Sequence, residues 1–385
     1  VAIGDQALYS ATATNGTIAI GQYAGYKFNS DAGNVYIGNI AGRYDTGANN
    51  VAVGAGSLAK EAIPAGAGGS NNIGIGNDAG NNQQGDGGVF IGFQAGKAPS
   101  STTSTGDYNI AIGYKAGYST TTASENTTVG YQAGYSITTA AYNTALGYAS
   151  LNSNTTGTYN TAIGHNAMLN SGDGVSSPTG STAVGHLAGR YPEGNYNTFI
   201  GYYSGRGSTA TRTSNLNTAV GREAMQSTLS DSENVAIGAA AMDSSTASHL
   251  NVVIGRSAMR SATAANRNVS IGYYSMSSFV GTSNTYNTAL GFYALNDLTT
   301  GIKNTVLGAS EDGHSLTTGS NNTSVGYEAG SATTTGSGNV FLGYLAGSDA
   351  TATDSNKLFI NNAAGTPLIG GDFSAGTVTV RGRSI

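Results

Sequence analysis

A two-residue pattern recurs along almost the whole chain: an aliphatic residue followed directly by glycine. Twenty of these pairs form a periodic series, mostly 17 residues apart, with spacings from 16 to 22. Self-similarity at a fixed short period is the signature of a repeat architecture. The pattern therefore predicts about twenty stacked coils. The glycines, each taken as position 0 of its coil, are Gly4, Gly21, Gly38, Gly54, Gly76, Gly92, Gly113, Gly130, Gly147, Gly164, Gly185, Gly201, Gly221, Gly238, Gly255, Gly272, Gly291, Gly308, Gly326 and Gly343.

Positions −3 to −1 of each coil predict a short β-strand. Position −3 is usually Thr or Val, −2 is usually Ala, and −1 is always Ile, Val or Leu. Because successive side chains of a strand point to opposite faces, −3 and −1 share one face and the small residues share the other. The flanking Gly, Asn, Ser and Thr residues are turn formers. We expect a second short strand at +1 to +4, as in Tyr114–Gly117, followed by a return segment.

Stacking would align equal positions of successive coils in columns. At the spacing of hydrogen-bonded strands, ~4.8 Å, twenty coils would form a rod of roughly 95 Å. Position −1 would form an aliphatic spine, and position −4 is Asn in 16 of the 19 coils that contain it. These asparagines have two interpretations: a ladder of hydrogen-bonded amides, or residues chosen for the left-handed backbone of a turn. Representative scaffold residues are Asn109, Asn126, Asn143, Asn160, Ile112, Ile163, Gly113 and Gly164.

The predicted fold is all-β, a β-solenoid (parallel β-roll) of about 20 coils of ~17 residues. We assign residues 1–355 to the repeat domain and 356–385 to a C-terminal β segment that caps or connects it. In that segment, Lys357–Asn362 and Thr377–Arg381 alternate like ordinary strands, with Gly370–Asp372 between them.

The small-residue columns suggest self-association. Position +3 is Ala or Ser in 19 of 20 coils, and all five methionines fall at +4. One coil has too few large apolar residues to fill a conventional core. The small side chains at −2 and +3 therefore predict close packing of another chain there, most simply in a parallel homotrimer.

The regular spacing is broken in a few coils. Longer gaps follow five of the glycines, and we expect loops there, on the side of the solenoid where contacts with other molecules are usually made. The segment Ala309–His314 carries charge where other coils have Ala and Gly, and it predicts a bulge or a local capping loop. The gaps include residues 62–69 and 171–178.

Composition and charge exclude several partners. A net charge of −5 does not suit a nucleic acid or an anionic membrane. The absence of cysteine excludes disulfides and thiolate metal sites, and no apolar run is long enough for membrane insertion of this segment. The chain opens in mid-repeat at Val1, so we expect a fragment of a longer polypeptide.

No residue set in the sequence predicts catalysis, a metal or a cofactor. Gly74–Gly80 superficially resembles a phosphate-binding loop, but its glycines are coil positions and no helix is expected after them. His165 and His186 occupy position +1, while His249 and His314 have no partner at metal-ligand spacing. We therefore expect a protein that is not an enzyme.

Position +1 is rich in aromatic residues and is the best candidate for binding. Exposed aromatic columns can bind sugars or partner proteins through their ring faces. Alternatively, the same residues pack in an interface between protomers, where aromatic residues are enriched. The tyrosines of this column are Tyr114, Tyr131, Tyr148, Tyr202, Tyr273, Tyr327 and Tyr344.

Two parts of the chain resemble known fibre proteins. The unit Asn-Thr-Ala-Ile-Gly, complete at Asn160–Gly164 and nearly so at Asn109–Gly113 and Asn143–Gly147, resembles head repeats of trimeric autotransporter adhesins. That resemblance implies a left-handed parallel β-roll that trimerises. The segment Asn356–Arg381, which contains Thr366–Phe373, resembles the stretch that precedes a self-cleaving intramolecular chaperone in phage tail fibres and some bacterial surface proteins. Both resemblances imply trimeric extracellular fibres.

These observations predict a structural fibre or adhesin in an extracellular or virion appendage, such as a tail fibre. It would attach to a surface or receptor, with a cell-surface or polysaccharide receptor as partner besides its own copies. The alternatives are a bacterial trimeric surface adhesin, a self-assembling filament, or an ice- or polysaccharide-binding solenoid. Ice binding would favour regular threonines on every coil, whereas threonine here clusters in the variable segments.

Overall fold

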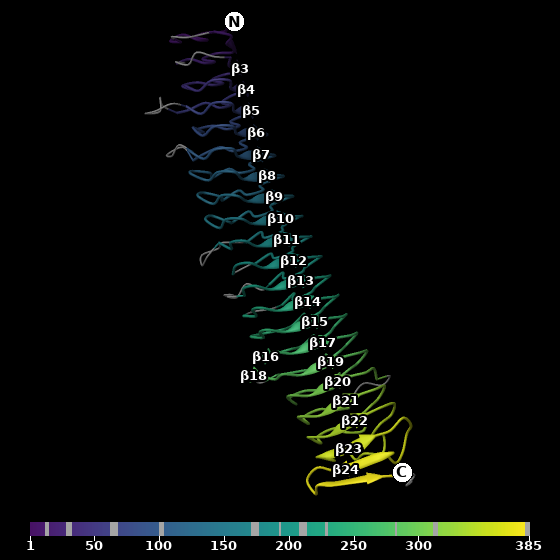
Figure 1. Cartoon of the computed structure of the whole chain (residues 1–385). Helices are drawn as coiled ribbons and strands as arrows, with labels where there is room; N and C mark the ends of the chain where they lie inside the picture. Colours follow the sequence, from purple (N-terminus) through teal and green to yellow (C-terminus); the bar gives the residue numbers. More distant parts are fainter. Residues whose placement is uncertain are drawn as a thin grey trace. The chain divides into compact units, whose positions relative to one another are not determined.

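The computed structural model describes residues 1–11, 15–27, 33–61, 68–99, 104–170, 177–191, 194–207, 214–227, 230–281, 283–310 and 315–381. These residues form strands and turns and contain no helix. The chain divides into two compact units, Val1–Tyr196 and Asn197–Ile385. Each unit is a stack of coils with one short strand at the same place in successive coils (Figure 1). The expected all-β solenoid with turns of about 17 residues is confirmed.

Each strand of the first unit covers positions −3 to −1, apart from the shorter first one. The strands are β1 (Ala2–Ile3), β2 (Ile18–Ile20), β3 (Val35–Ile37), β4 (Val51–Val53), β5 (Ile73–Ile75), β6 (Val89–Ile91), β7 (Ile110–Ile112), β8 (Thr127–Val129), β9 (Thr144–Leu146), β10 (Thr161–Ile163) and β11 (Thr182–Val184).

The second unit repeats this arrangement and adds two other kinds of strand. A two-residue pair, β16 and β18, joins return segments, and three longer strands follow the last coil. The strands are β12 (Thr198–Ile200), β13 (Thr218–Val220), β14 (Val235–Ile237), β15 (Val252–Ile254), β16 (Ala265–Asn266), β17 (Val269–Ile271), β18 (Ser283–Asn284), β19 (Thr288–Leu290), β20 (Thr305–Leu307), β21 (Thr323–Val325), β22 (Val340–Leu342), β23 (Lys357–Ile360), β24 (Ile369–Asp372) and β25 (Thr377–Val380).

Coil strands pair in parallel, with equal positions opposite one another. Ile163 of β10 lies opposite Leu146 of β9, for example. Val53 likewise lies opposite Ile75, although 22 residues separate them. The longer gaps therefore leave the stacking of the strands unchanged. Much of the predicted loops lies outside the described residues, namely 62–67, 171–176 and, in the predicted bulge, 311–314.

Position 0 requires glycine because the backbone of the next coil lies in contact with it. Gly130 has a φ of 136°, and a Cβ atom built there would lie 2.3 Å from the carbonyl oxygen of Gly147 in the next coil. Any side chain would push the two coils apart. The same close approach recurs along both units, which explains why the glycine is never replaced.

The prediction of a second strand at +1 to +4 is wrong. Tyr114–Gly117 forms a turn in which Lys115 and Gly117 have left-handed backbones, with φ of 51° and 55°. Hydrogen bonds between coils continue through this turn: the Lys115 amide donates to the Phe93 carbonyl and the Gly117 amide to the Ala133 carbonyl, both at 2.9 Å. The alternation of backbone handedness bends the chain at a corner while preserving these bonds.

The small-residue columns lie inside the coil and not at a contact with another chain. Ala162 at −2 and Ala167 at +3 are both fully buried within the single chain. The interpretation that these columns mark where a second chain packs is therefore wrong. The side chains at −3 and −1 point outward instead, so the aliphatic spine lies on the surface.

The side chains at −2 and +4 have complementary sizes and together fill the core of each coil. Where −2 is Ala, a buried Met or Leu often occupies +4, as in the pair Ala162 and Met168. Where −2 is aromatic, +4 is Gly: a Cβ atom at Gly42 would lie 2.2 Å from the Tyr36 ring. All five methionines lie at +4 in coils whose −2 residue is Ala, Ser or Val, where a flexible side chain fills the space that an aromatic ring would occupy.

The C-terminal segment extends the sheet of the last coils and turns back on itself. Leu358 of β23 lies opposite Val340 of β22 in parallel, and β24 and β25 follow as an antiparallel meander. Gly370–Asp372, which was expected between strands, belongs to β24. The Phe359 ring stacks on the buried Phe341 ring at 5.2 Å, so β23 also continues the core.

Candidate functional site

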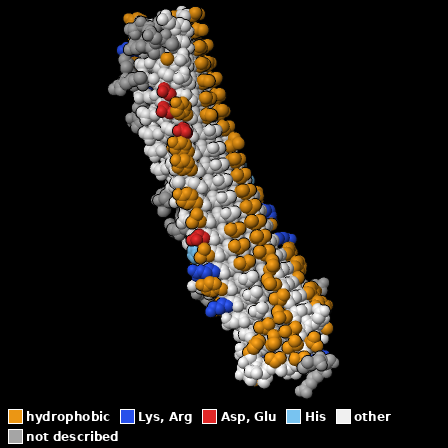
Figure 2. All heavy atoms as spheres, in the orientation of Figure 1, with side chains coloured by type: hydrophobic (Ala, Val, Ile, Leu, Met, Phe, Trp, Pro, Cys, Tyr) orange, Lys and Arg blue, Asp and Glu red, His pale blue; other side chains and the backbone are white. Residues whose placement is uncertain are grey.

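The outward side chains at −3 and −1 form two columns on each unit, which we call the strand face. Position −1 is aliphatic in every coil, and position −3 is Val or Ile in some coils and Thr in others. Leu146 in the first unit and Leu290 in the second are 46% and 45% exposed. Figure 2 shows hydrophobic side chains aligned in a column that passes from coil to coil and crosses the successive strands. Position −3 is threonine throughout β8–β11, so threonine is not confined to the variable segments as we expected. The scaffold residues Ile112 and Ile163 belong to this face and are half-buried.

The aromatic column at +1 lies beside the strand face and is stacked in the first unit. The rings of Tyr114 and Tyr131 are 5.0 Å apart and 6° from parallel, and those of Tyr131 and Tyr148 are 4.9 Å apart. His165 and His186, which also occupy position +1, continue this stack. All three tyrosines are 41% to 49% exposed.

In the second unit the same column is interrupted. Tyr202 contacts its neighbour Tyr203 at 4.1 Å and a tilt of 46°. Tyr273 stacks on Phe292, and Tyr327 stacks on Tyr344. Other coils between these groups have Arg or Ala at +1. The seven predicted tyrosines therefore form short groups rather than one continuous site.

Stacking limits what the aromatic column can bind. A ring whose two faces are covered by neighbouring rings presents its edge and its hydroxyl group to solvent. Sugars pack on ring faces, and in Tyr131 both faces are directed at Tyr114 and Tyr148. The column is thus better suited to edge contacts and hydrogen bonds with a partner protein than to stacking on a sugar.

The asparagines at −4 form hydrogen-bonded ladders inside the coils. The Asn143 side-chain amide donates to Asn126 Oδ1 at 3.1 Å and to the Gly157 carbonyl at 3.0 Å. Its own Oδ1 accepts from the backbone amide of Asn160 at 2.9 Å and from that residue's side chain at 3.1 Å. Left-handed backbones occur one residue earlier, as at Tyr142, and not at the asparagines. The ladder, which begins in this group at Asn109, is therefore structural.

Among the described residues of the first unit, one buried ion pair lies next to the apolar core. Lys60 Nζ lies 2.6 Å from Asp45 Oδ1, and both side chains are almost fully buried. Tyr36 and Asn50 donate to the other carboxylate oxygen, each at 2.9 Å. Burial, together with the adjacent carboxylate, raises the pKa of the Tyr36 hydroxyl well above its ordinary value. Because every charged group has a partner, this network suits a structural role.

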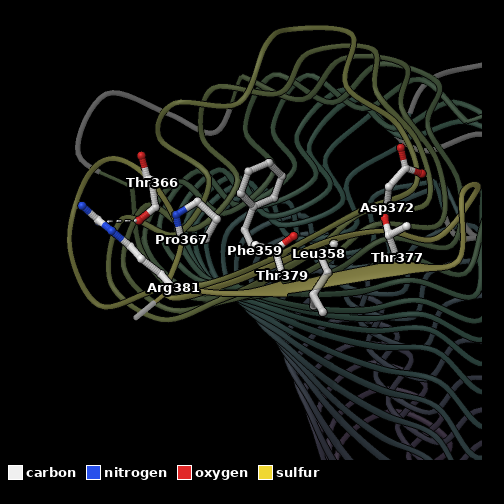
Figure 3. A pocket seen from close by; sticks show the side chains of 10 residues that line it. Leu358, Phe359, Thr366, Pro367, Asp372, Thr377, Thr379 and Arg381 are labelled. Carbon is white, nitrogen blue, oxygen red and sulfur yellow. Dashed lines mark hydrogen bonds between the residues drawn. The ribbon is translucent and has the colours of Figure 1, made fainter. Parts of the chain in front are cut away.

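A cavity of about 420 Å³ lies on the C-terminal meander (Figure 3). Thr366, Pro367 and Arg381 lie on one side of it and Asp372 on the other, with Phe359 between them. Arg381 donates to the Thr366 carbonyl at 3.4 Å. A hydrogen bond from Lys357 to Asp372 holds the pKa of that carboxyl below its usual range. The charged groups at both ends are thus engaged with neighbours.

The described residues contain no group of three or more His, Asp or Glu side chains able to hold a metal ion. His249 Nδ1 accepts a hydrogen bond from the Ser232 amide, and His314 lies outside the described residues. Within the described part of the chain, no helix has the length and hydropathy needed to span a membrane.

The chain was compared with known protein families, proteins and structures. No family model, no curated protein and no solved structure matches the chain.

Proposed function

We propose that the chain is a non-enzymatic structural fibre protein that assembles as a parallel homotrimer through its strand face. The observation that carries this proposal is the apolar surface formed by the aliphatic column at −1, together with the Val and Ile residues at −3. Soluble monomers rarely expose contiguous apolar patches larger than a few hundred Å². Aliphatic side chains at −1, such as Leu146, Ile200 and Leu290, are 39% to 46% exposed and lie next to one another in successive coils. Repeated along the coils of each unit, they form a contiguous apolar surface, before the aromatic column is added.

A second copy of the chain is the partner that fits this surface best. Its columns have the same spacing, so side chains of every coil can meet their counterparts along the whole contact. A threefold assembly uses a heterologous interface, which joins two different patches of neighbouring protomers. The aliphatic strand face and the adjacent aromatic column provide two such patches.

Within this proposal the fibre belongs to an extracellular or virion appendage, a tail fibre, and mediates attachment to a surface or receptor. The composition, with 10% charged residues and many Gly, Ala, Ser and Thr, suits a shaft that holds binding elements apart. The repeat resemblance to trimeric adhesin heads and the C-terminal resemblance to tail fibres support the same role. A bacterial surface adhesin and a self-assembling filament are the alternatives that would use the same assembly.

Analytical ultracentrifugation of the chain tests the assembly. The wild type should sediment as a trimer. Combining Leu146→Lys with Leu290→Lys, one in each unit, should shift it toward monomer because charges would be desolvated at the contact. The control is Thr122→Lys, at an exposed return-segment position, which should remain trimeric. A wild-type monomer that retains its β-structure by circular dichroism contradicts the proposal, as does a double variant that stays trimeric. Electron microscopy separates discrete rods from continuous filaments.

A further inference from the structure

We infer that a cavity in the first coils of the first unit binds a sugar that carries a carboxylate. The cavity, which we call the tyrosine pocket, measures about 350 Å³ and is lined by Gln6, Tyr23, Tyr26, Arg43 and Tyr44. This inference specifies a ligand for the proposed attachment role, and it therefore rests on the proposed function. Sequence reasoning missed it because its residues come from three successive coils and from positions +2, +5 and +6 rather than +1.

The rings of the tyrosine pocket meet at steep angles, although one face of Tyr26 is covered by a parallel stack with Tyr9 at 5.6 Å. Tyr26 stands edge-to-face with Tyr23, at 5.3 Å and 69°, and with Tyr44, at 6.2 Å and 79°. Rings at steep angles form walls of different orientation around a cavity, whereas a parallel stack covers its own faces. Aromatic walls with a few convergent polar groups, in a cavity of 300 Å³ or more, are typical of small-molecule sites.

The charge in the pocket selects an anion. The Arg43 guanidinium lies over the Tyr44 ring, 4.6 Å from its centroid, and donates to the Tyr44 hydroxyl at 3.3 Å. No carboxylate among the described residues forms an ion pair with Arg43. Lys27 Nζ lies 5.9 Å from the same ring and adds a second positive charge. None of the five lining residues is acidic. Glu61 and Asp78 share a second pocket with Arg43, where Asp78 is paired with Lys97, and Asp45 is paired with Lys60.

Together these groups match an acidic sugar. A guanidinium held by stacking is pre-organised for bidentate bonds to a carboxylate. Tyrosine rings offer apolar surface to the C–H face of a sugar, and their hydroxyls, with the Gln6 amide, can bond its hydroxyl groups. A neutral sugar would leave the guanidinium without its anion, and a simple carboxylate would leave the aromatic walls uncovered. Both therefore bind more weakly.

Ligand-observed NMR titration of the full chain with glucuronate tests this inference, with glucose and acetate as neutral and non-sugar comparisons. We expect saturable binding of glucuronate, about tenfold tighter than that of either comparison. Arg43→Gln should remove the preference over glucose, and Arg43→Lys should retain part of it. The matched control is Arg206→Gln, because Arg206 also stacks on a tyrosine, Tyr203, at 4.8 Å but does not line the pocket.

Several results would overturn the inference. They are absence of saturable glucuronate binding, equal affinity for glucose, or an Arg43→Gln variant that binds as the wild type does. Circular dichroism of the variant establishes that it is folded. Titration with an oligomer of galacturonate distinguishes a site for a polysaccharide chain from one for a free sugar. A trimer that binds no acidic sugar removes this inference alone, while a monomer that binds it removes only the proposed assembly.

Discussion

At the scale of single residues, this fold depends on side chains that cannot be exchanged between coil positions. Glycine at position 0 makes room for the next backbone, and asparagine at −4, present in 16 of 19 coils, joins a coil to its neighbours. Asn143 contacts Asn126 on one side and Asn160 on the other, and it is 1% exposed. A buried polar group without a partner destabilises the folded state. Each asparagine is thus held in place by the next.

Replacing one ladder residue should therefore be costly. Asn143→Ala leaves Asn126 Oδ1, the Gly157 carbonyl and the Asn160 groups with fewer partners. We expect the free energy of unfolding, measured by urea denaturation, to fall by about 1–3 kcal/mol or more. The exposed-site variant Thr122→Ala should change it by less than about 0.5 kcal/mol. Equal stability of Asn143→Ala and wild type would mean that the ladder does not stabilise the coils.

At the scale of the coil, two leucines of one coil face opposite environments. Leu146, at the end of β9, is 46% exposed on the strand face, whereas Leu151 at +4 is fully buried. Alternation along the strand and the turn that follows it produce this difference within six residues. The inward residue supports the core of its own chain, and the outward residue is available to a second copy.

These two leucines provide a matched test of the inward and outward assignments. Leu151→Ala leaves a core cavity and should lower the unfolding free energy by about 2–5 kcal/mol at any protein concentration. Leu146→Ala should act mainly on association, so its effect on the thermal midpoint should depend on protein concentration. Melting curves measured over a dilution series distinguish the two. Identical, concentration-independent losses would contradict the assignment of the faces.

At the scale of the whole molecule, each unit is a stack in which a coil contacts mainly its two neighbours. The parallel pairing of β8, β9 and β10 is typical of both units. In such repeat proteins, stability is approximately a sum of coil and interface contributions, and local opening need not spread through the array. The C-terminal meander differs, because its antiparallel strands and the contact between Phe341 and Phe359 end the stack.

Local damage should accordingly remain local. In Leu151→Ala, hydrogen exchange should accelerate in the coils of β8, β9 and β10 and return to the wild-type rate in β1 and β25. Exchange followed by peptide mass spectrometry measures this profile. The outward variant Leu146→Ala serves as the control, at a concentration where association is complete. Uniform acceleration along the chain would instead show one cooperative block.

The sequence by itself determined the period, the strand at −3 to −1 and the columns that stacking would produce. These follow because glycine at position 0 and alternation in the strand are local requirements. Only the tertiary structure decided which face is inside. Alternation defines two faces without ranking them, and the core becomes recognisable when a small −2 residue such as Ala162 meets Met168 at +4.

The corner at +1 to +4 and the tyrosine pocket were also beyond the sequence. Left-handed backbones at residues such as Lys115 are held by hydrogen bonds from neighbouring coils, which no local propensity predicts. The pocket gathers Tyr23, Tyr26 and Tyr44 from positions that differ between coils. The repeat therefore predicts what all coils share, and contacts between particular coils decide where they differ.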